Sequence, residues 1–478
     1  MTEEKLNTTE LNKIKERQNR PSVSWIYREE ESGKRKVDIP KLGKTILAEH
    51  NCLIVENSDK EDFYEYNEKL HYWEQRNIKS LKSVVTSLLN KQGMWRDKTA
   101  RDAFHFISDS IKRVKRADTF GKIQGNYFNF KNGVWDWDAM QLIPHDPKYY
   151  FTFCTDYDLI VYDIAKAEQE AKNADHKKNR PLETEKWLAL SLRENITPMM
   201  EFIGYAFYPS YEPIQAFLML FGKGGDGKTT FANYLSDLLV KSNVAHVSIE
   251  NLTDDKSNNF SLSELYGKWL NIHADISKAF IKNSSALKNL TGDDDINAPV
   301  KNQKDVVFKN HAKLLFIGNE EPSFSDTTDG FKRRAFIMTF KRIDDFKSQF
   351  SMDKIKQERG KFVYTCIYYA KKAMDRGKFT VTPSIETARN KWLSDNDPVQ
   401  QFLNENYIQV DDSKINQNEL YRDYREWCDN NGTKPLSNTR LKNELERKGI
   451  VRHSKQLRKS DGQRPRFYYY IGLEPKNN

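Results

Sequence analysis

The chain has 478 residues, with 77 lysines and arginines against 68 aspartates and glutamates, a net charge of +9 and an isoelectric point of about 8.9. This length predicts roughly two to four domains, and the modest basic excess suits a polyanionic partner without proving one. The four cysteines lie far apart with no CxxC pair, which argues against a zinc site or a disulfide framework: Cys52, Cys154, Cys366 and Cys428.

The N-terminal stretch MTEEKLNTTELNKIKERQ is charged throughout and lacks the apolar core of a signal peptide. No later stretch supplies the roughly eighteen uninterrupted apolar residues of a membrane helix. We therefore expect a soluble, cytoplasmic protein without a membrane partner.

The segment from Gly125 to Thr152 contains Asp136 and Asp138 in a D-x-D arrangement, which in a primase would hold two Mg²⁺ ions. NGVWDWDAM also reads as strand, turn and strand with both acids near the turn, and no further histidine and acid motif completes a primase site. We favour a turn over a primase metal site at this D-x-D pair.

The polar stretch from Ala165 to Pro181 is expected to be a solvated helix or an exposed connection that separates this N-terminal region from the rest of the chain.

Leu218 to Leu239, LMLFGKGGDGKTTFANYLSDLL, combines an apolar strand, a glycine loop and a helix. This is the phosphate-loop pattern, in which backbone N–H groups converge on phosphate oxygens. We expect Lys228 to reach the β and γ phosphates of ATP and Thr229 to hold Mg²⁺. The predicted nucleotide-binding residues are Gly222, Gly224, Gly225, Asp226, Gly227, Lys228, Thr229 and Thr230.

Three further apolar strands carry polar residues where such an ATPase needs them. KWLNIHADI ends at Asp275, the expected ligand of the Mg²⁺ shell, and AKLLFIGNEEP has Asn319 at its exit, where an amide orients water. Arg333 and Arg334 precede the fourth run, where an arginine often reaches the γ phosphate of a neighbouring subunit. Taken singly, each is equally a surface aspartate, a strand-terminating asparagine or a solvated basic pair.

Between Asp275 and Asn319, Ile296 to Val300 and Val306 to Phe308 are expected to be two short strands. Lys301 and Lys304 lie in the polar tip that joins them. Lysines on such a tip are well placed to grip a phosphate backbone, but their spacing alone fits ordinary surface lysines equally well.

The last eighty or so residues are expected to form a separate unit, reached through an amphipathic helix, KFVYTCIYYAKKAM, and a hinge-like region from Pro383 to Pro398 with a short helix. Helices are predicted over Glu419 to Asn430 and Ser437 to Lys448, capped by Asn418 and Ser437. Two strands come next, around a Ser-Asp-Gly turn. Helix, helix and basic hairpin are the outline of a winged helix.

Seven basic side chains make the case for duplex DNA at this unit. Arg440 and Lys442 lie on the helix that would enter the major groove, and the wing carries Lys455, Arg458, Lys459, Arg464 and Arg466. Winged helices also mediate protein contacts. Tyr468, Tyr469 and Tyr470 could stack on bases, although strand alternation favours core packing for one or two of them.

The order GKGGDGKTT, LNIHADI, LKNLTGDDDINAPVKNQKD, LLFIGNEEP and GFKRRAFIMTF resembles the superfamily-three helicase domain of phage and plasmid primase-helicases, from Met199 to about Phe340. Gly125 to Thr152 resembles the accessory domain that lies upstream of the helicase in that family. The resemblance implies an AAA+ ATPase in a hexameric ring, with single-stranded DNA in its channel and 3′ to 5′ translocation.

It also implies residue roles. Gly222 to Thr229 would be the Walker A loop, Asp275 the Walker B acid, Asn319 the sensor, Lys301 and Lys304 the channel hairpin, and Arg334, or else Arg333, the arginine finger. Two positions depart from the family: Asp226 stands where asparagine is usual, and Ile276 stands where many relatives have a second acid. The first predicts weaker phosphate binding unless its side chain points away, and the second leaves the water-activating base unassigned.

The expected architecture is α/β and multidomain. An α+β accessory domain spans residues 1–190, an AAA+ domain with a parallel sheet 191–345, a helical lid and linker 346–398, and a winged helix 399–478.

The function we expect is that of a self-loading replicative helicase of a mobile element in a bacterial host, such as a phage, a plasmid or a staphylococcal pathogenicity island with its Rep protein. It would bind origin duplex through its C-terminal domain, with a separate primase as a further candidate partner. The rivals are an initiator ATPase without unwinding and a bifunctional primase-helicase.

Overall fold

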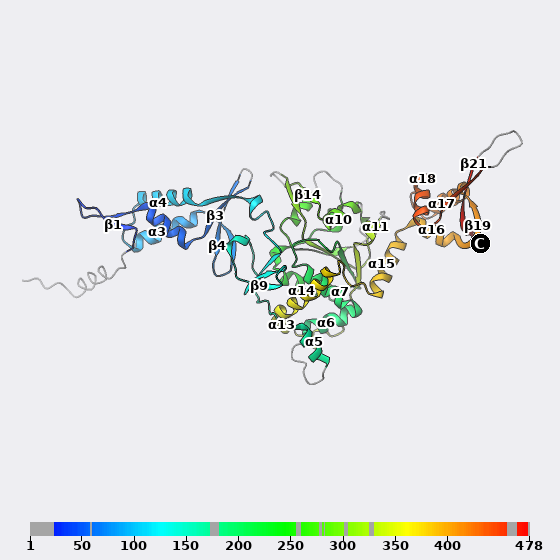
Figure 1. Ribbon diagram of the computed structural model, residues 1–478, viewed down its shortest axis with the longest axis horizontal. Helices are drawn as coiled ribbons and strands as arrows, with labels where there is room; N and C mark the ends of the chain where they lie inside the picture. The colour runs from blue at the N-terminus through cyan, green and yellow to red at the C-terminus, as the bar shows by residue number, and fades with distance from the viewer. Residues whose placement is uncertain are drawn as a thin grey trace, which may run out of the picture.

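The computed structural model describes residues 23–57, 60–172, 181–254, 260–276, 280–281, 283–300, 305–324, 329–456 and 466–476. Figure 1 shows three parts along the longest axis: an N-terminal helix and sheet unit, a broad central body, and a small C-terminal unit beyond helix α15 (Pro383–Asp395). None of the described helices combines the length and apolar character needed to cross a bilayer.

The N-terminal unit is a sheet in the order β5-β4-β3-β6 with three helices packed on it. Helices α2 and α4 cross closely, because a Cβ at Gly43 would lie 2.3 Å from the ring of Phe106. A two-stranded ribbon, β1 (Ile26–Arg28) and β2 (Arg35–Val37), precedes them. The remaining elements are α2 (Ile39–Glu49), β3 (Cys52–Asn57), β4 (Lys60–Asn67), β5 (Tyr72–Arg76), α3 (Lys79–Lys91), α4 (Asp97–Ser110) and β6 (Lys112–Lys115).

The central body is built on five parallel strands in the order β11-β12-β16-β10-β18. Side chains of β10 alternate between two cores: Leu218 and Leu220 face one, and Phe217 and Met219 face the other. The strands are β10 (Phe217–Phe221), β11 (Val244–Ala245), β12 (Leu270–Ile276), β16 (Lys313–Gly318) and β18 (Ala335–Thr339). Because all five run the same way, the loops after them meet at one edge of the sheet.

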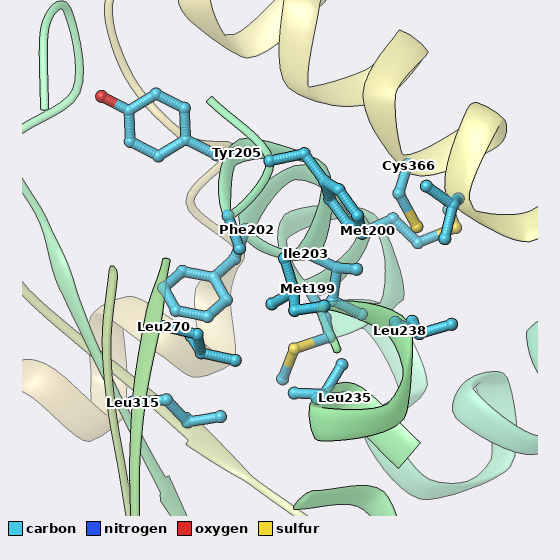
Figure 2. Packing of buried hydrophobic residues seen from close by; sticks show 14 of the residues in the cluster. Met199, Met200, Phe202, Ile203, Tyr205, Leu235, Leu238, Leu270, Leu315 and Cys366 are labelled. Atoms are coloured by element: carbon cyan, nitrogen blue, oxygen red, sulfur yellow. The ribbon is translucent and has the colours of Figure 1, made fainter. Parts of the chain in front are cut away.

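Helices cover both faces of this sheet. Figure 2 shows Met199, Phe202 and Ile203 of α7 packed between Leu270 and Leu315 of the sheet and Leu235 and Leu238 of α8, with Cys366 of α14 alongside. A Cβ at Gly204 would lie 2.0 Å from the Cys366 carbonyl oxygen, so α7 and α14 touch backbone to backbone. The helices of this face are α6 (Glu183–Leu192), α7 (Ile196–Tyr205), α8 (Lys228–Leu238), α13 (Met352–Gln357) and α14 (Arg359–Asp375).

The same core extends across residue 190, where we expected a domain boundary. Phe128, Trp135 and Trp187 belong to the cluster that contains α7 and α14. They come from a small sheet, β7 (Tyr127–Phe130), β8 (Gly133–Asp136) and β9 (Gln141–Ile143), and from α6; α5 (Ile164–Lys172) occupies the start of the expected polar connection. By packing, residues from about 127 onward belong to the central body.

The expected short hairpin is present. β14 (Asp295–Ala298) and β15 (Val306–Lys309) pair antiparallel, with Asp295 opposite Lys309. Its tip lysines, Lys301 and Lys304, lie outside the described residues. The opposite face of the sheet is completed by α10 (Ser284–Leu290), α11 (Asp329–Lys332) and α15. In α15, Trp392 is fully buried and donates Nε1–H to the Pro322 carbonyl oxygen, so the helix expected in a hinge packs on the central body.

The C-terminal unit packs three helices on an antiparallel sheet in the order β19-β21-β20. The cap of its second helix is Asn416, whose side chain accepts from Asn418 N–H, so our choice of Asn418 as the cap was wrong; Ser437 caps the third helix as expected. Tyr470 is buried in the core. The elements are α16 (Pro398–Asn406), β19 (Tyr407–Asn416), α17 (Gln417–Asn430), α18 (Asn438–Arg447), β20 (Arg452–Gln456) and β21 (Arg466–Pro475).

Candidate nucleotide and nucleic-acid sites

The glycine loop joins β10 to α8 and turns too tightly for other residues. Gly225 and Gly227 have φ of 75° and 97°, in the left-handed region that favours glycine. A Cβ at Gly222 would lie 2.0 Å from Asp226 Oδ2 and 2.5 Å from the Phe340 carbonyl oxygen, whereas Gly224 meets nothing within 4 Å. The loop is therefore closed toward the sheet and open on its outer side, where a polyphosphate would lie.

Lys228 is the centre of the hydrogen-bonding network within this loop. Its side chain is almost fully buried, and Nζ donates to the carbonyl oxygens of Gly222 at 2.9 Å and Lys223 at 3.2 Å. Nζ also donates to Asp226 Oδ2 at 2.7 Å and to Asn319 Oδ1 at 3.3 Å. Lys228, the residue expected to bind phosphate, therefore has its ammonium group in contact with protein acceptors in this structure.

Asp226 points into the loop. Its Oδ1 accepts from the backbone N–H of Lys228 at 3.3 Å, and its Oδ2 forms the ion pair with Nζ. Both side chains are more than nine-tenths buried, so little water screens the pair. The carboxylate turns away from the open outer side of the loop but competes with any phosphate for the Lys228 ammonium.

Thr229 and Thr230 lie in the first turn of α8, at the open side of the loop. The N–H groups of a helical first turn have no intrahelical acceptor and favour an anion. A hydroxyl ligand for Mg²⁺ and backbone donors are therefore available there, and these groups fit a nucleotide with its magnesium ion.

Asn319 follows β16, the strand next to β10, and Asp275 lies near the end of β12, on the other side of β16. β16 pairs with β10 through Gly318 and Phe221, and with β12 through Gly318 and Ile276. This register brings Asn319 within hydrogen-bonding distance of Lys228 and places the backbone of Asp275 at the same edge, within the irregular stretch between His273 and Ile276. The three motifs therefore converge at the carboxyl edge of one parallel sheet.

Arg333 and Arg334 lie at the opposite edge, at the start of β18. Arg334 is buried and donates from Nη1 to the Gly330 carbonyl oxygen at 2.6 Å and from Nη2 to Gln215 Oε1 at 2.7 Å. Burial, and then the neighbouring guanidinium of Arg333, lower the pKa of Arg334. Arg333 is exposed. The sequence did not reveal Gln215, because its partner lies 119 positions away and no local pattern marks it.

The side chains of Asp136 and Asp138, the D-x-D pair, accept hydrogen bonds that stabilise a turn. Asp136 Oδ1 accepts from the backbone N–H groups of Asp138 at 2.9 Å and Ala139 at 3.0 Å, and Asp138 Oδ1 accepts from Asn126. Across the described part of the chain, no group of three or more histidines, cysteines and carboxylates is placed to hold a metal. The structure agrees with the turn that we favoured.

The C-terminal basic residues fall on α18 and on the wing strands. Arg440 is exposed, while Lys442 is half-buried and pairs with Glu446 at 3.5 Å. Lys455 and Arg466 are exposed at the wing end of the sheet, where Gln456 lies opposite Arg466. Arg458, Lys459 and Arg464 lie outside the described residues. Four of the seven predicted DNA contacts are therefore located, on two neighbouring parts of the unit.

Comparison with known proteins gives three partial family matches. Residues 44–190 match the model for "D5 N terminal like" proteins, residues 394–466 that for "Poxvirus D5 protein-like", and residues 220–334 a family of unknown function, DUF5906. A curated relative, "Putative helicase L207/L206" of Acanthamoeba polyphaga mimivirus, is 25% identical over 344 residues. That match covers 66% of this chain, and the chain spans about a third (34%) of the relative's length.

The chain is therefore similar to D5-like proteins and to a viral putative helicase. Two solved structures of the NrS-1 C-terminal region are also similar to it. One is 14% identical and covers 91% of this chain and 100% of that chain, and the other is 12% identical and covers 90% and 98%; both have a TM-score of 0.48.

Proposed function

We propose that the protein is an ATP-driven DNA helicase of the superfamily-three type that acts in replication. The observation that carries the proposal is the convergence of the glycine loop, Asn319 and the end of the Asp275 strand at one sheet edge, with Lys228 and Asn319 already in contact at 3.3 Å. Matches to D5-like models and to a viral putative helicase support the same class.

In this proposal, Lys228 leaves Asp226 and takes the β and γ phosphates of ATP, while Thr229 and Asp275 hold Mg²⁺. The ion, when bound, neutralises charge on those phosphates. Asn319 orients the attacking water. The sheet edge holds Asn319 beside Lys228 before ATP arrives, so the reorganisation that binding requires is the release of Lys228 from Asp226.

The arginines at the opposite edge support a composite active site. β10 and β18 are parallel and five residues long, so the start of β18 lies about 16 Å from the glycine loop by strand rise. An arginine there serves the phosphates of a neighbouring subunit in a ring, which the family resemblance implies to be a hexamer. We assign that role to exposed Arg333, while buried Arg334 positions the turn that carries it.

The C-terminal unit supports recognition of duplex DNA. The order helix, strand, two helices and two strands supports a winged helix, and exposed Arg440, Lys455 and Arg466 support a basic surface for phosphates. In this proposal the unit binds an origin of a mobile element and the ring then translocates 3′ to 5′ on one strand. An initiator ATPase that binds the origin without unwinding it is the second candidate, favoured by the same basic unit.

The test is ATP-dependent unwinding of a forked duplex by the unaltered protein, Lys228→Ala and Lys301→Ala/Lys304→Ala. Lys347→Ala/Lys356→Ala, two exposed lysines away from the hairpin, is the matched control. We expect both test variants to lose unwinding, the first to lose ATPase activity as well, and the control to keep both. If the unaltered protein hydrolyses ATP and binds duplex but separates no strands with either tail polarity, the helicase proposal fails and the initiator ATPase takes its place.

A further inference from the structure

A cavity of about 420 Å³ lies where residues 117–153 meet the segments 266–269 and 308–311 of the central body. Its size is that of a site for a small molecule or a single nucleotide. Aromatic side chains dominate its lining, and no lining residue carries a carboxylate. This composition distinguishes it from the glycine loop, which lies at the other edge of the sheet.

Rings form two walls of this cavity. In the wall formed by residues 117–153, the ring centroids of Tyr127 and Tyr149 lie 4.9 Å apart. In the wall formed by segments 266–269 and 308–311, Tyr266 packs against Phe308 at 5.3 Å. Tyr127, Tyr149 and Tyr266 are half-buried rather than enclosed. Their unburied ring area is available to a flat apolar ligand inserted between the walls.

The two walls meet at Gly121. A Cβ there would lie 2.6 Å from the Tyr266 hydroxyl oxygen and 2.8 Å from the Arg116 carbonyl oxygen. Glycine at this position therefore lets the N-terminal segment approach Tyr266 directly. A larger residue at 121 would push the segment that carries it away from Tyr266.

Two lysines supply the charge. Lys122 is exposed, and Lys309, the last residue of β15, pairs with Asp293 at 2.5 Å. Aromatic faces combined with cations, and no carboxylate in the lining, are what a protein uses to bind nucleotides of a single strand: rings stack on bases and lysines attract phosphates. A protein ligand would more often require a longer apolar groove.

The position of the cavity also fits single-stranded DNA. Phe308 and Lys309 belong to β15, the returning strand of the hairpin whose tip lysines we propose as DNA contacts. The cavity is therefore lined by the same hairpin strand that leads from the proposed DNA contacts. We propose that the cavity binds a nucleobase of single-stranded DNA between its aromatic walls, an inference that rests on the proposed function.

The experiment compares full-length protein binding to oligothymidylate with binding to an abasic oligonucleotide of equal length, without ATP. The variant Tyr127→Leu/Tyr149→Leu removes the stacking rings, and Tyr127→Phe/Tyr149→Phe keeps them. We expect the unaltered protein and the Phe variant to prefer the base-bearing strand by about tenfold, and the Leu variant to lose most of that preference. Abasic affinity should be equal in all three. A Leu variant that retains the preference overturns the proposal.

Photocrosslinking covers the case in which the Leu variant folds poorly. Oligothymidylate with 5-iodouracil, irradiated with the unaltered protein, should crosslink at Tyr127, Tyr149 or Tyr266; crosslinks confined to other segments overturn the proposal. If thymidine monophosphate protects these tyrosines from crosslinking and unlabelled oligothymidylate does not, the site would be reassigned to free nucleotides. If the rings bind bases but the protein unwinds no duplex, only the proposed helicase function is refuted. If the protein unwinds duplex and the Leu variant still prefers the base-bearing strand, only the base site is refuted.

Discussion

Asp226 and Lys228 form a buried ion pair within the glycine loop, with Oδ2 and Nζ 2.7 Å apart. The lysine that the motif assigns to phosphates is therefore neutralised by a residue of the same loop. In the proposed function, ATP would displace this carboxylate and then lie close to it.

Asp226→Asn should tighten ATP binding by about tenfold, because it removes both a competitor for Lys228 and a like charge beside the phosphates. Titration with a fluorescent ATP analogue measures the effect. Asp237→Asn, on the same helix as Lys228 and paired with Lys241 at the surface, is the control and should leave the affinity unchanged. Equal affinities of Asp226→Asn and the unaltered protein would mean that the ion pair does not oppose nucleotide binding.

Arg333→Ala should lower ATP hydrolysis by about a thousandfold while leaving ATP binding and the melting temperature unchanged, as for loss of an arginine finger. Arg334→Ala should instead lower the melting temperature, because it removes the donor to the Gly330 carbonyl oxygen and the shorter of the two arginine contacts to Gln215 Oε1, the other being from Arg333 at 3.5 Å. Calorimetry and a steady-state ATPase assay separate the two. If Arg334→Ala melts normally and is inactive, the roles are the reverse of those proposed.

Mixing subunits tests whether the site is composite. Lys228→Ala and Arg333→Ala proteins should each be inactive, and a mixture should recover part of the ATPase activity at interfaces that combine an intact loop with an intact arginine. No recovery in a mixture that demonstrably co-assembles would place the arginine outside the active site of its neighbour.

His311 should make stability depend on pH. Burial, and then the nearby Lys313 ammonium, lower its pKa to about 3. The unfolded chain binds a proton near pH 6.5 and the folded chain does not, so stability is full above pH 6.5 and falls as the pH drops toward 3. Between pH 7 and pH 5 the loss should be about 2 kcal/mol.

The measurement is the denaturant midpoint of the central body at the two pH values. His311→Phe should remove this part of the pH dependence, whereas His105→Phe, at an exposed position of α4, should not. An identical pH dependence in His311→Phe and the unaltered protein would contradict the prediction.

Lys455→Ala/Arg466→Ala should weaken duplex binding with little dependence on sequence and reduce the slope of log K against log salt by about 2, one unit for each phosphate contact. Arg425→Ala/Lys434→Ala, also exposed in the C-terminal unit, is the charge-matched control and should leave the slope unchanged. A slope that changes equally in both pairs would indicate a general charge effect instead of a specific surface.

Local patterns predicted the strands and the hairpin, whereas the role expected of Asn319 stays a prediction and its contact with Lys228 is a finding of the structure. They did not reveal that Arg334 is committed to Gln215, or that Lys313 is buried with its ammonium between the carbonyl oxygens of Tyr208, Ser210 and His311. These contacts mostly join residues far apart in the chain. The direction of such side chains is set by tertiary packing. The spacing of residues within a motif carries no information about that packing.

The core that runs across residue 190 determines how this chain can be divided. Tyr157 donates its hydroxyl hydrogen to the Leu238 carbonyl oxygen at the end of α8, and Trp137 donates Nε1–H to the Phe207 carbonyl oxygen. A fragment that starts at 191 would expose the apolar residues these rings cover and lose the anchor of the helix that begins with Lys228. A fragment meant to keep the glycine loop folded must therefore begin before β7, because the sheet of β7, β8 and β9 is a structural part of the central body rather than a detachable accessory.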